Sequence, residues 1–362
     1  MLKQVKRISQ ALLPLLLLAL LVACTPAAEP GPEAQTPDGQ ASLPEPLTIR
    51  VATLRGPSGI GMVQMMGLMA ESADGLYHNP QIDEFAGQQV PRRYQFELLG
   101  APEEVVAMII SGNVDIAALP SNLAANLYQL TQGDIYLIAI PTLGTLYLLE
   151  NGETIHSWED LRGRTIYATG QGANPEFILR HLLEANGLIP GVDVQVQFLT
   201  EHAELATLLA ENMVAVGILP EPNVTAAQAQ NSDLRVVFDF TAEWAKVAEG
   251  ALAMSAVVAR REFVAAYPDA IDNFLFDLKT SINFVANNVP EAADLAAEFG
   301  VIPQAALALR AIPNLNLTMI TGTALRPVIE PYLQVLYNAN PQSVGGALPD
   351  EAFFYIPQVA IE

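Results

Sequence analysis

The chain has 362 residues, 51% of them hydrophobic, and carries 17 Lys and Arg against 39 Asp and Glu, a formal net charge of −22. Such an acidic composition excludes nucleic-acid binding, which depends on basic side chains that neutralise phosphates. The single cysteine, Cys24, excludes an intrachain disulfide, a cysteine-ligated zinc or iron–sulfur site, and a cysteine nucleophile in the folded part.

The chain opens with a basic segment and a short apolar run. Lys and Arg side chains precede apolar residues 15–23, and the run ends at Cys24. This order is typical of a secretory signal peptide, and the run is too short to span a bilayer, which takes about 20 apolar residues. Residues 21–24 also resemble the lipobox of bacterial lipoproteins, whose cysteine becomes the lipidated first residue. We therefore expect a signal peptide over 1–23 and a lipid anchor on Cys24, with ordinary secretion as the alternative.

A segment rich in proline, glycine and acids follows. Residues 24–46 show no apolar period, so they cannot bury enough surface to offset the entropy of ordering. We expect a disordered tether there. Cleavage before Cys24 removes three basic residues and no acidic one, which leaves 14 Lys and Arg against 39 Asp and Glu, a net charge of −25.

The rest of the chain contains a repeat at a shift of 100 residues. Residues 94–122 and 194–222 share their apolar pattern without a gap, and each copy predicts a strand, a helix, a second buried strand and a proline-led loop. The alternative is that any two βαβ units look somewhat alike. Either way, the length and the pattern indicate two α/β lobes of similar plan.

The predicted strands alternate with helices, which implies parallel sheets covered on both faces. We expect strands near residues 48–53, 94–99, 114–118 and 135–141 in the first lobe, and near 164–168, 194–199, 214–218 and 234–238 in the second. The strand-like residues 252–259 would return the chain to the first lobe. The last third is predicted to be helical, with an apolar face between Ile271 and Val285 and a further helix over 326–340.

The polar loops after the predicted strands are the candidate ligand contacts, because ligands of open α/β sheets collect beyond the carboxyl ends of the strands. The candidate residues are Leu54, Arg55, Gly56, Pro57, Ser58, Gly59, Ser121, Asn122, Thr142, Gln171, Gly172, Asn174, Glu201, Glu221 and Trp244. Two alternatives stay open, a plain turn at residues 170–172 and a core position for Trp244. The glycine-rich loops match neither a P-loop nor the dinucleotide-binding spacing.

Catalysis finds little support in the sequence. The four histidines, His78, His156, His181 and His202, show no paired-ligand spacing and no HExxH motif. His202 either faces the cleft or has a capping or surface role. We expect no catalytic residue, no metal and no cofactor.

Several segments resemble one family. Residues 52–59, 111–117, 158–166 and 219–222 are similar to motifs of the solute-binding lipoproteins of bacterial ABC importers. More narrowly, they resemble the nitrate/sulfonate/taurine-type proteins, a family that also includes binders of thiamine pyrimidine precursors. The resemblance covers residues 48–355.

This resemblance implies a type II periplasmic-binding-protein fold, in which two doubly wound α/β lobes are joined by a two-crossing hinge. Lobe I would comprise residues 47–143 and 255–362, and lobe II residues 144–254. It also implies a monomer held by Cys24 at the outer face of the cytoplasmic membrane. There it would capture a small molecule in the cleft and deliver it to an ABC permease and its ATPase.

The charge of the proposed cleft favours one class of ligand. Arg55 is the only basic residue among the candidate loops, whereas Glu201 and Glu221 would repel an anion. We therefore favour a neutral or cationic, nitrogen-bearing organic ligand. The alternatives are a sulfonate, nitrate or similar small anion, a surface sensor, and a pyrimidine-synthase-like enzyme, whose cysteine-rich and histidine motifs are absent here.

Overall fold

The computed structural model describes residues 45–79 and 91–358. The expected signal peptide, Cys24 and the tether up to residue 44 lie outside the described residues. Within the described ranges, no helix has the length and apolar character needed to cross a membrane.

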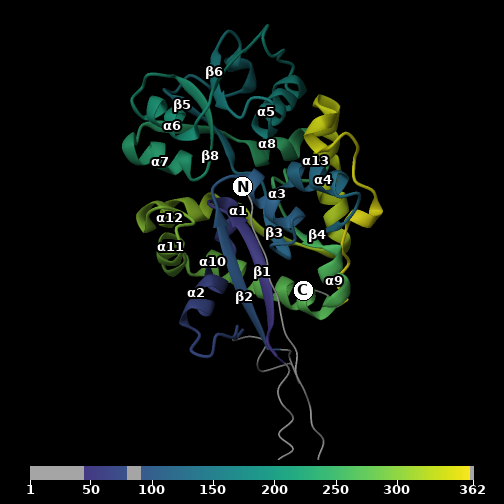
Figure 1. Cartoon of the computed structure of the whole chain (residues 1–362). Coiled ribbons are helices and arrows are strands. Elements are labelled where there is room, and N and C mark those ends of the chain that lie inside the picture. The colour runs from purple at the N-terminus through teal and green to yellow at the C-terminus, as the bar shows by residue number, and fades with distance from the viewer. Residues whose placement is uncertain (1–44, 80–90, 359–362) are drawn as a thin grey trace, which may run out of the picture. The chain divides into compact units, whose positions relative to one another are not determined.

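The first of two β-sheets has six strands in the order β11-β4-β10-β3-β1-β2 (Figure 1). These strands are β1 Leu47–Leu54, β2 Arg92–Leu99, β3 Ile116–Pro120, β4 Ile135–Thr142, β10 Ser255–Arg260 and β11 Leu317–Ile320. The central strands β1, β3, β4 and β10 are almost continuously buried, whereas the edge strand β2 alternates between buried and exposed residues. Their Val, Ile, Leu and Ala content suits strands covered on both faces.

The second sheet has five strands in the order β7-β6-β8-β5-β9. They are β5 Leu146–Asn151, β6 Thr165–Thr169, β7 Gln195–Leu199, β8 Val216–Pro220 and β9 Leu234–Asp239. Read from the other edge, this order matches the run β4-β10-β3-β1-β2 of the first sheet. The repeat therefore reflects two sheets of the same plan, with β2 and β3 equivalent to β7 and β8.

The prediction of parallel sheets is correct for only part of each sheet. The pairs β1–β2, β1–β3, β6–β7 and β6–β8 are parallel, but β10 runs antiparallel to β3 and β4, and β5 runs antiparallel to β8 and β9. The reason is the path of the chain. It leaves the six-stranded sheet after β4, enters the other sheet as β5 and returns as β10, so the crossings bring one reversed strand into each sheet. The edge strand β11 is a second reversed strand of the six-stranded sheet, antiparallel to β4.

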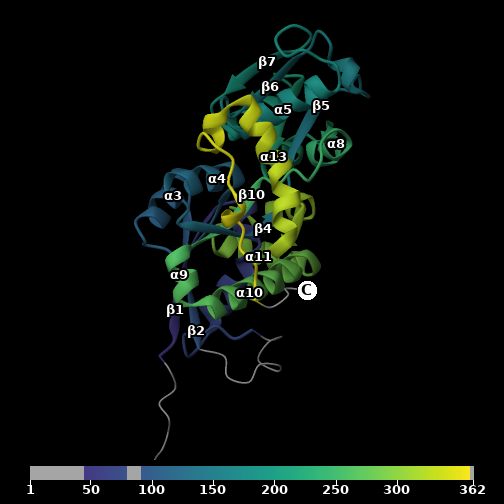
Figure 2. The ribbon, with the colours of Figure 1, turned by 90° about the vertical axis from the view of Figure 1, so that its right-hand side faces the viewer.

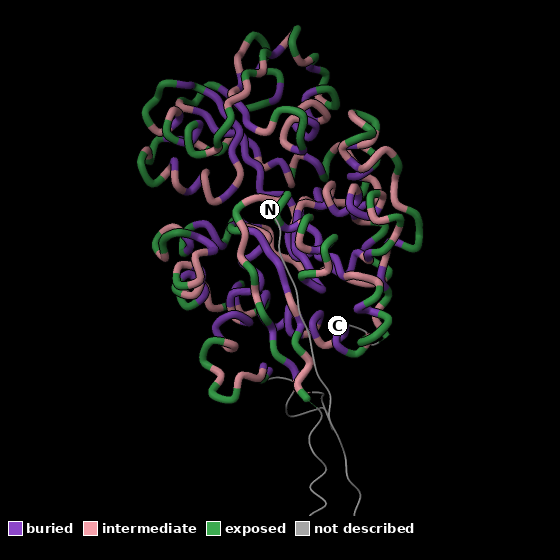
Figure 3. Tube along the Cα trace, viewed as in Figure 1, coloured by how far each residue is buried: buried purple, intermediate pink, exposed green. Residues whose placement is uncertain are grey.

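Helices cover the faces of both sheets, as Figure 1 shows for α6 and α7 beside the five-stranded sheet. They are α1 Pro57–Ile60, α2 Val63–Glu71, α3 Pro102–Ile110, α4 Ser121–Leu130, α5 Asn174–Ala185, α6 His202–Ala210, α7 Asn223–Gln230, α8 Phe240–Val247, α9 Arg261–Ala266, α10 Pro268–Asn287, α11 Val289–Glu298, α12 Ala305–Ala311 and α13 Leu325–Ala339. Short 3₁₀ turns are η1 Trp158–Leu161, η2 Ile312–Asn314, η3 Gly322–Ala324, η4 Pro341–Val344 and η5 Glu351–Phe353. Burial follows this layering, since the central strands are mostly buried and the outer turns of the helices are exposed (Figure 3).

The helical tail packs as its apolar pattern predicts. On α10 the predicted face is buried from Ile271 to Val285. Helix α13 packs against α4, which follows a strand of the first sheet, and against α5, which follows a strand of the second (Figure 2). There the Tyr332 ring meets the Trp244 ring edge to face, with the ring centroids 5.7 Å apart. The C-terminal tail thus contributes to a hydrophobic core that both sheets share.

Candidate ligand-binding site

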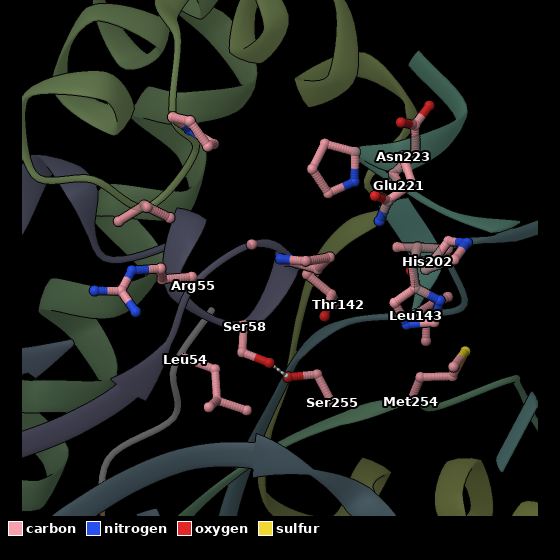
Figure 4. A pocket seen from close by; sticks show the side chains of 17 residues that line it. Leu54, Arg55, Ser58, Thr142, Leu143, His202, Glu221, Asn223, Met254 and Ser255 are labelled. Atoms are coloured by element: carbon pink, nitrogen blue, oxygen red, sulfur yellow. Dashed lines mark hydrogen bonds between the residues drawn. The ribbon is translucent and has the colours of Figure 1, made fainter. Parts of the chain in front are cut away.

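A cavity of about 390 Å³ lies between loops of the two sheets (Figure 4). The end of β1, the crossing after β4, the loop after β8 and the start of β10 supply most of its wall. The lining residues are Leu54, Arg55, Gly56, Pro57, Ser58, Thr142, Leu143, Thr145, His202, Pro220, Glu221, Pro222, Asn223, Met254, Ser255, Val301 and Pro303. Half of the lining side chains are apolar and half are polar or charged, so the wall combines apolar surface with groups that can orient a small molecule.

Two glycines shape the turn that carries the β1 end into the wall. Gly56 has φ +85°, a conformation that favours glycine, and its N–H donates to the Val301 carbonyl at 2.8 Å. A Cβ on Gly59 would lie 2.5 Å from the Leu54 carbonyl oxygen, so only glycine lets α1 fold back onto its strand. The glycines therefore join the loop after β1 to the turn between α11 and α12, and they set the position of Ser58.

Glu221 is the acidic group of the wall, and only 2% of it is exposed. The Thr225 N–H donates to its Oε2 at 3.1 Å, and the Thr225 hydroxyl donates to its Oε1 at 2.9 Å. The Asn314 side-chain amide donates to the same Oε1 at 3.1 Å. Burial raises the pKa of Glu221, and the bonds from Thr225 and Asn314 oppose that rise because they favour the ionised carboxylate.

His202 also faces this cavity, at the first position of α6. Its Nδ1 lies 2.6 Å from the Thr169 hydroxyl at the end of β6. Burial lowers the pKa of His202, an effect that the nearby Glu201 partly opposes. The ring therefore favours its neutral form, in which it offers one donor and one acceptor.

Three hydroxyl groups of the wall are weakly bonded or unbonded. The Ser255 hydroxyl reaches the Ser58 hydroxyl at 3.4 Å, drawn as a dashed line in Figure 4. Thr142 is 1% exposed, and its Oγ1 has no hydrogen-bond partner within the described structure. Because a buried hydroxyl without a partner is costly, Thr142 is well suited to bind a polar ligand atom.

The charged groups of the wall lie far apart. In Figure 4 the Arg55 guanidinium lies on the opposite side of the view from Glu221 and His202. Arg55 is exposed, whereas Glu221 is buried, so the buried charge of the wall is negative. Among the described residues, no three His, Cys, Asp or Glu side chains form a group that could hold a metal ion.

The structure brings part of the predicted site together. Leu54, Arg55, Gly56, Pro57, Ser58, Thr142 and Glu221 all line the cavity. Gly59 lies behind this wall, where it packs against the backbone of Leu54.

The other predicted residues lie away from the cavity wall. Ser121 is buried, and its hydroxyl donates to the Ala253 carbonyl at 2.5 Å. The Asn174 side-chain amide on α5 donates to the Asn122 Oδ1 on α4 at 2.8 Å, so these two side chains bond each other. Trp244 is fully buried, with its ring centroid 4.9 Å from that of His181. The indole therefore occupies the core, the alternative that the sequence left open.

The loop after β6 does not line the cavity either. Gly172 has φ +74°, and its N–H donates to the Glu176 Oε2 at 2.7 Å, which is the geometry of a turn. Gln171 beside it and Glu201 before α6 are both exposed.

Several lining residues are not among the candidate residues, although Pro220 and Pro222 belong to the 219–222 segment that the sequence singles out. They are Leu143, Thr145, Pro220, Pro222, Asn223, Met254, Ser255, Val301 and Pro303. At the shift of 100 residues Ser121 corresponds to Glu221 and Asn122 to Pro222, so the repeat indicates Pro222 but not Asn223. Val301 and Pro303 come from the turn between α11 and α12, and no local pattern places that turn beside β1.

Comparisons with known proteins agree with this architecture. The profile of the family described as "ABC transporter, phosphonate, periplasmic substrate-binding protein" matches residues 84–305. The solved structure of an ABC transporter protein from Parabacteroides distasonis aligns with a TM-score of 0.66 at 24% identity, over 86% of this chain and 99% of that chain. No curated protein matches the chain.

Two sulfonate-binding proteins are also similar in structure. The periplasmic aliphatic sulphonate-binding protein SsuA from Escherichia coli aligns with a TM-score of 0.65 at 16% identity, over 86% of this chain and 93% of that chain. The alkanesulfonate-binding SsuA from Xanthomonas axonopodis pv. citri, bound to MOPS, aligns with a TM-score of 0.57 at 14% identity, over 86% and 97%. At these identities the likeness concerns the fold.

Proposed function

Because the chain belongs to the family of ABC-transporter, phosphonate-type periplasmic substrate-binding proteins, we propose that its cavity captures a small nitrogen-bearing organic molecule, neutral or cationic, for import. The predicted fold and the predicted resemblance are confirmed: the chain has a type II periplasmic-binding fold and is a substrate-binding protein of an ABC importer. The identity of its ligand is the open part of the function.

The observation that carries the proposal is the buried Glu221 on the cavity wall. A buried, ionised carboxylate on a cavity wall attracts a cation or an N–H donor and repels an anion. A carboxylate has about four lone-pair sites, and the bonds from Thr225 and Asn314 use three of them. One acceptor position on Oε2 is therefore left for a ligand, and the unpartnered Thr142 hydroxyl supplies a second polar contact.

A small anion is the second candidate. The family description names phosphonate, and Arg55 at the cavity wall supplies a positive charge. An anion would have to sit near Arg55 and away from Glu221. The two candidates therefore place the ligand at opposite ends of the cavity.

Three probes of similar size separate the candidates by calorimetry: the benzamidinium cation, neutral benzamide and the phenylphosphonate anion. We expect benzamidine to bind most tightly, and we expect the affinities for benzamidine and benzamide to become equal in Glu221→Gln. If phenylphosphonate binds most tightly and loses affinity in Arg55→Gln but not in Glu221→Gln, the anion candidate is correct. If none of the three stabilises the protein against heat at millimolar concentration, the assignment of this cavity fails.

We also propose that the protein works as a monomer, tethered through Cys24 to the outer face of the cytoplasmic membrane. A tether keeps the loaded protein at a high local concentration near the permease and its ATPase. Binding without turnover belongs to the same proposal. Mass spectrometry of a bound metabolite before and after long incubation tests it, because a chemically changed product would revive the enzyme alternative.

A further inference from the structure

The bond to Glu221 from Asn314 joins parts of the molecule that are distant in sequence. Glu221 follows β8 of the five-stranded sheet, whereas Asn314 ends η2, just before β11 of the six-stranded sheet. The Tyr147 hydroxyl of β5 donates to the Asn314 carbonyl at 2.8 Å, so the backbone of Asn314 is fixed independently of its side chain. Helix α12, which precedes Asn314, packs against α7.

Asn314 also covers Glu221. Asn314 is exposed, whereas the carboxylate that it bonds is almost fully buried, so the amide lies between the solvent and Glu221. Asn314 does not line the cavity. It therefore touches the carboxylate from behind while the ligand would approach from the front.

The groups around Glu221 come from several elements. Thr225 of α7 and Asn314 of η2 donate to it, and the charge of Arg310 on α12 also lowers its pKa. Tyr147 of β5 lies close enough for Glu221 to raise the tyrosine pKa, after the larger effect of burial. His202 and Arg55 line the same cavity. Thr225 follows Glu221 by only four residues, so Asn314 is the hydrogen-bond donor to Glu221 that comes from a distant part of the chain.

We propose that Asn314 is a positioning residue: from the tail, it holds the Glu221 carboxylate as an anion oriented toward the cavity, and it thereby makes the cavity selective for a positively charged ligand. The selectivity rests on the proposed function, whereas the positioning of Glu221 does not depend on any ligand. A carboxylate that loses a donor without gaining water becomes easier to protonate, and a protonated Glu221 no longer prefers a cation to a neutral molecule of the same shape.

The test uses Asn314→Leu, which keeps a covering side chain but has no donor. The titration of Glu221 is followed by the ¹³C carboxyl signal of glutamate-labelled protein, assigned by its loss in Glu221→Gln. We expect the midpoint of Glu221 to rise in Asn314→Leu. We also expect the preference for benzamidine over benzamide near neutral pH to fall at least about threefold, because a hydrogen bond to a charged group is lost.

Asn316→Gly is the matched control. Its side-chain amide donates to the Gly144 carbonyl at 2.6 Å and not to Glu221, and glycine suits its φ of +47°. This variant should leave the Glu221 midpoint unchanged. If Asn314→Leu unfolds the tail, Asn314→Asp replaces it. Aspartate has the size of asparagine and a negative charge like that of Glu221, so it should also raise the titration midpoint of Glu221.

Each outcome decides between the claims. An unchanged Glu221 midpoint in a folded Asn314→Leu protein, or an equal rise in Asn316→Gly, overturns the positioning role. A risen midpoint with an unchanged benzamidine preference overturns the selectivity. A risen midpoint in a protein that binds none of the probes supports the positioning role and refutes the proposed cationic ligand.

Discussion

Trp244 provides the sharpest test of where the core ends and the binding site begins. Its indole is fully buried on α8 and contacts the rings of His181 and Tyr332. A buried aromatic side chain removes about 150–250 Å² from water, worth about 4–6 kcal/mol at ~25 cal/mol per Å². Trp244→Ala should therefore lower the free energy of unfolding by about 3–5 kcal/mol, measured by denaturant unfolding at an unchanged m-value.

The aromatic replacements sharpen this prediction. The Trp244 Nε1 has no hydrogen-bond partner within the described structure, so Trp244→Phe loses packing alone. The Trp158 Nε1 donates to the Glu243 Oε2 at 3.0 Å, so Trp158→Phe also breaks a hydrogen bond and leaves its acceptor short of a donor. We expect Trp244→Phe to keep most of the stability and all of the probe affinity. If Trp244→Ala stays stable but loses probe binding, the indole contacts the ligand and our placement of it is refuted.

Three further predictions follow from single residues. Burial lowers the pKa of His202 below its ordinary value of 6.5, so the unfolded chain takes up a proton before the folded one as the pH falls. The free energy of unfolding should therefore decline below about pH 6.5. Urea unfolding between about pH 7 and pH 5 should show a smaller decline in His202→Gln. Thr142→Val removes an unpartnered hydroxyl, so we expect less than about 1 kcal/mol of destabilisation but weaker benzamidine binding, and unchanged binding would argue against a ligand contact there. Cys24→Ala should leave probe binding intact and release the protein from membranes on fractionation, and a variant that stays membrane-bound would contradict the lipid anchor.

Local patterns were sufficient to predict most elements of the fold. The bounds of the eight predicted lobe strands lie within two residues of observed ones, and the strand predicted at 252–259 begins three residues before β10. Buried strands between turn residues give a strong apolar signal. Strand β5 was missed because it follows β4 after only a short crossing, residues 143–145. Strand β11, Leu317–Ile320, was also missed, so the prediction of a wholly helical last third is wrong there. Strand direction could not be read locally either. It depends on which sheet the chain enters, and β5 and β10 are reversed because each is the strand on which the chain enters the other sheet.

The site was harder to predict than the fold. Loops at strand ends can be found from the sequence, and Arg55, Ser58, Thr142 and Glu221 were found in that way. What the sequence cannot supply is which strand ends share a cavity. Asn122 and Asn174 also follow strands, yet they bond each other instead of lining the wall. Conversely, Val301 reaches the cavity because its carbonyl accepts the Gly56 N–H, a contact across 245 residues that no local pattern encodes.

The most direct test of the central claim is native mass spectrometry of the protein purified from its own host. We expect a single small metabolite to accompany the folded chain, to carry a basic or neutral nitrogen group, and to be lost or weakened in Glu221→Gln. A bound phosphonate or sulfonate that Glu221→Gln retains would contradict the proposed ligand class. A folded protein that never carries a small molecule, from the host or from added extracts, would contradict capture in this cavity altogether.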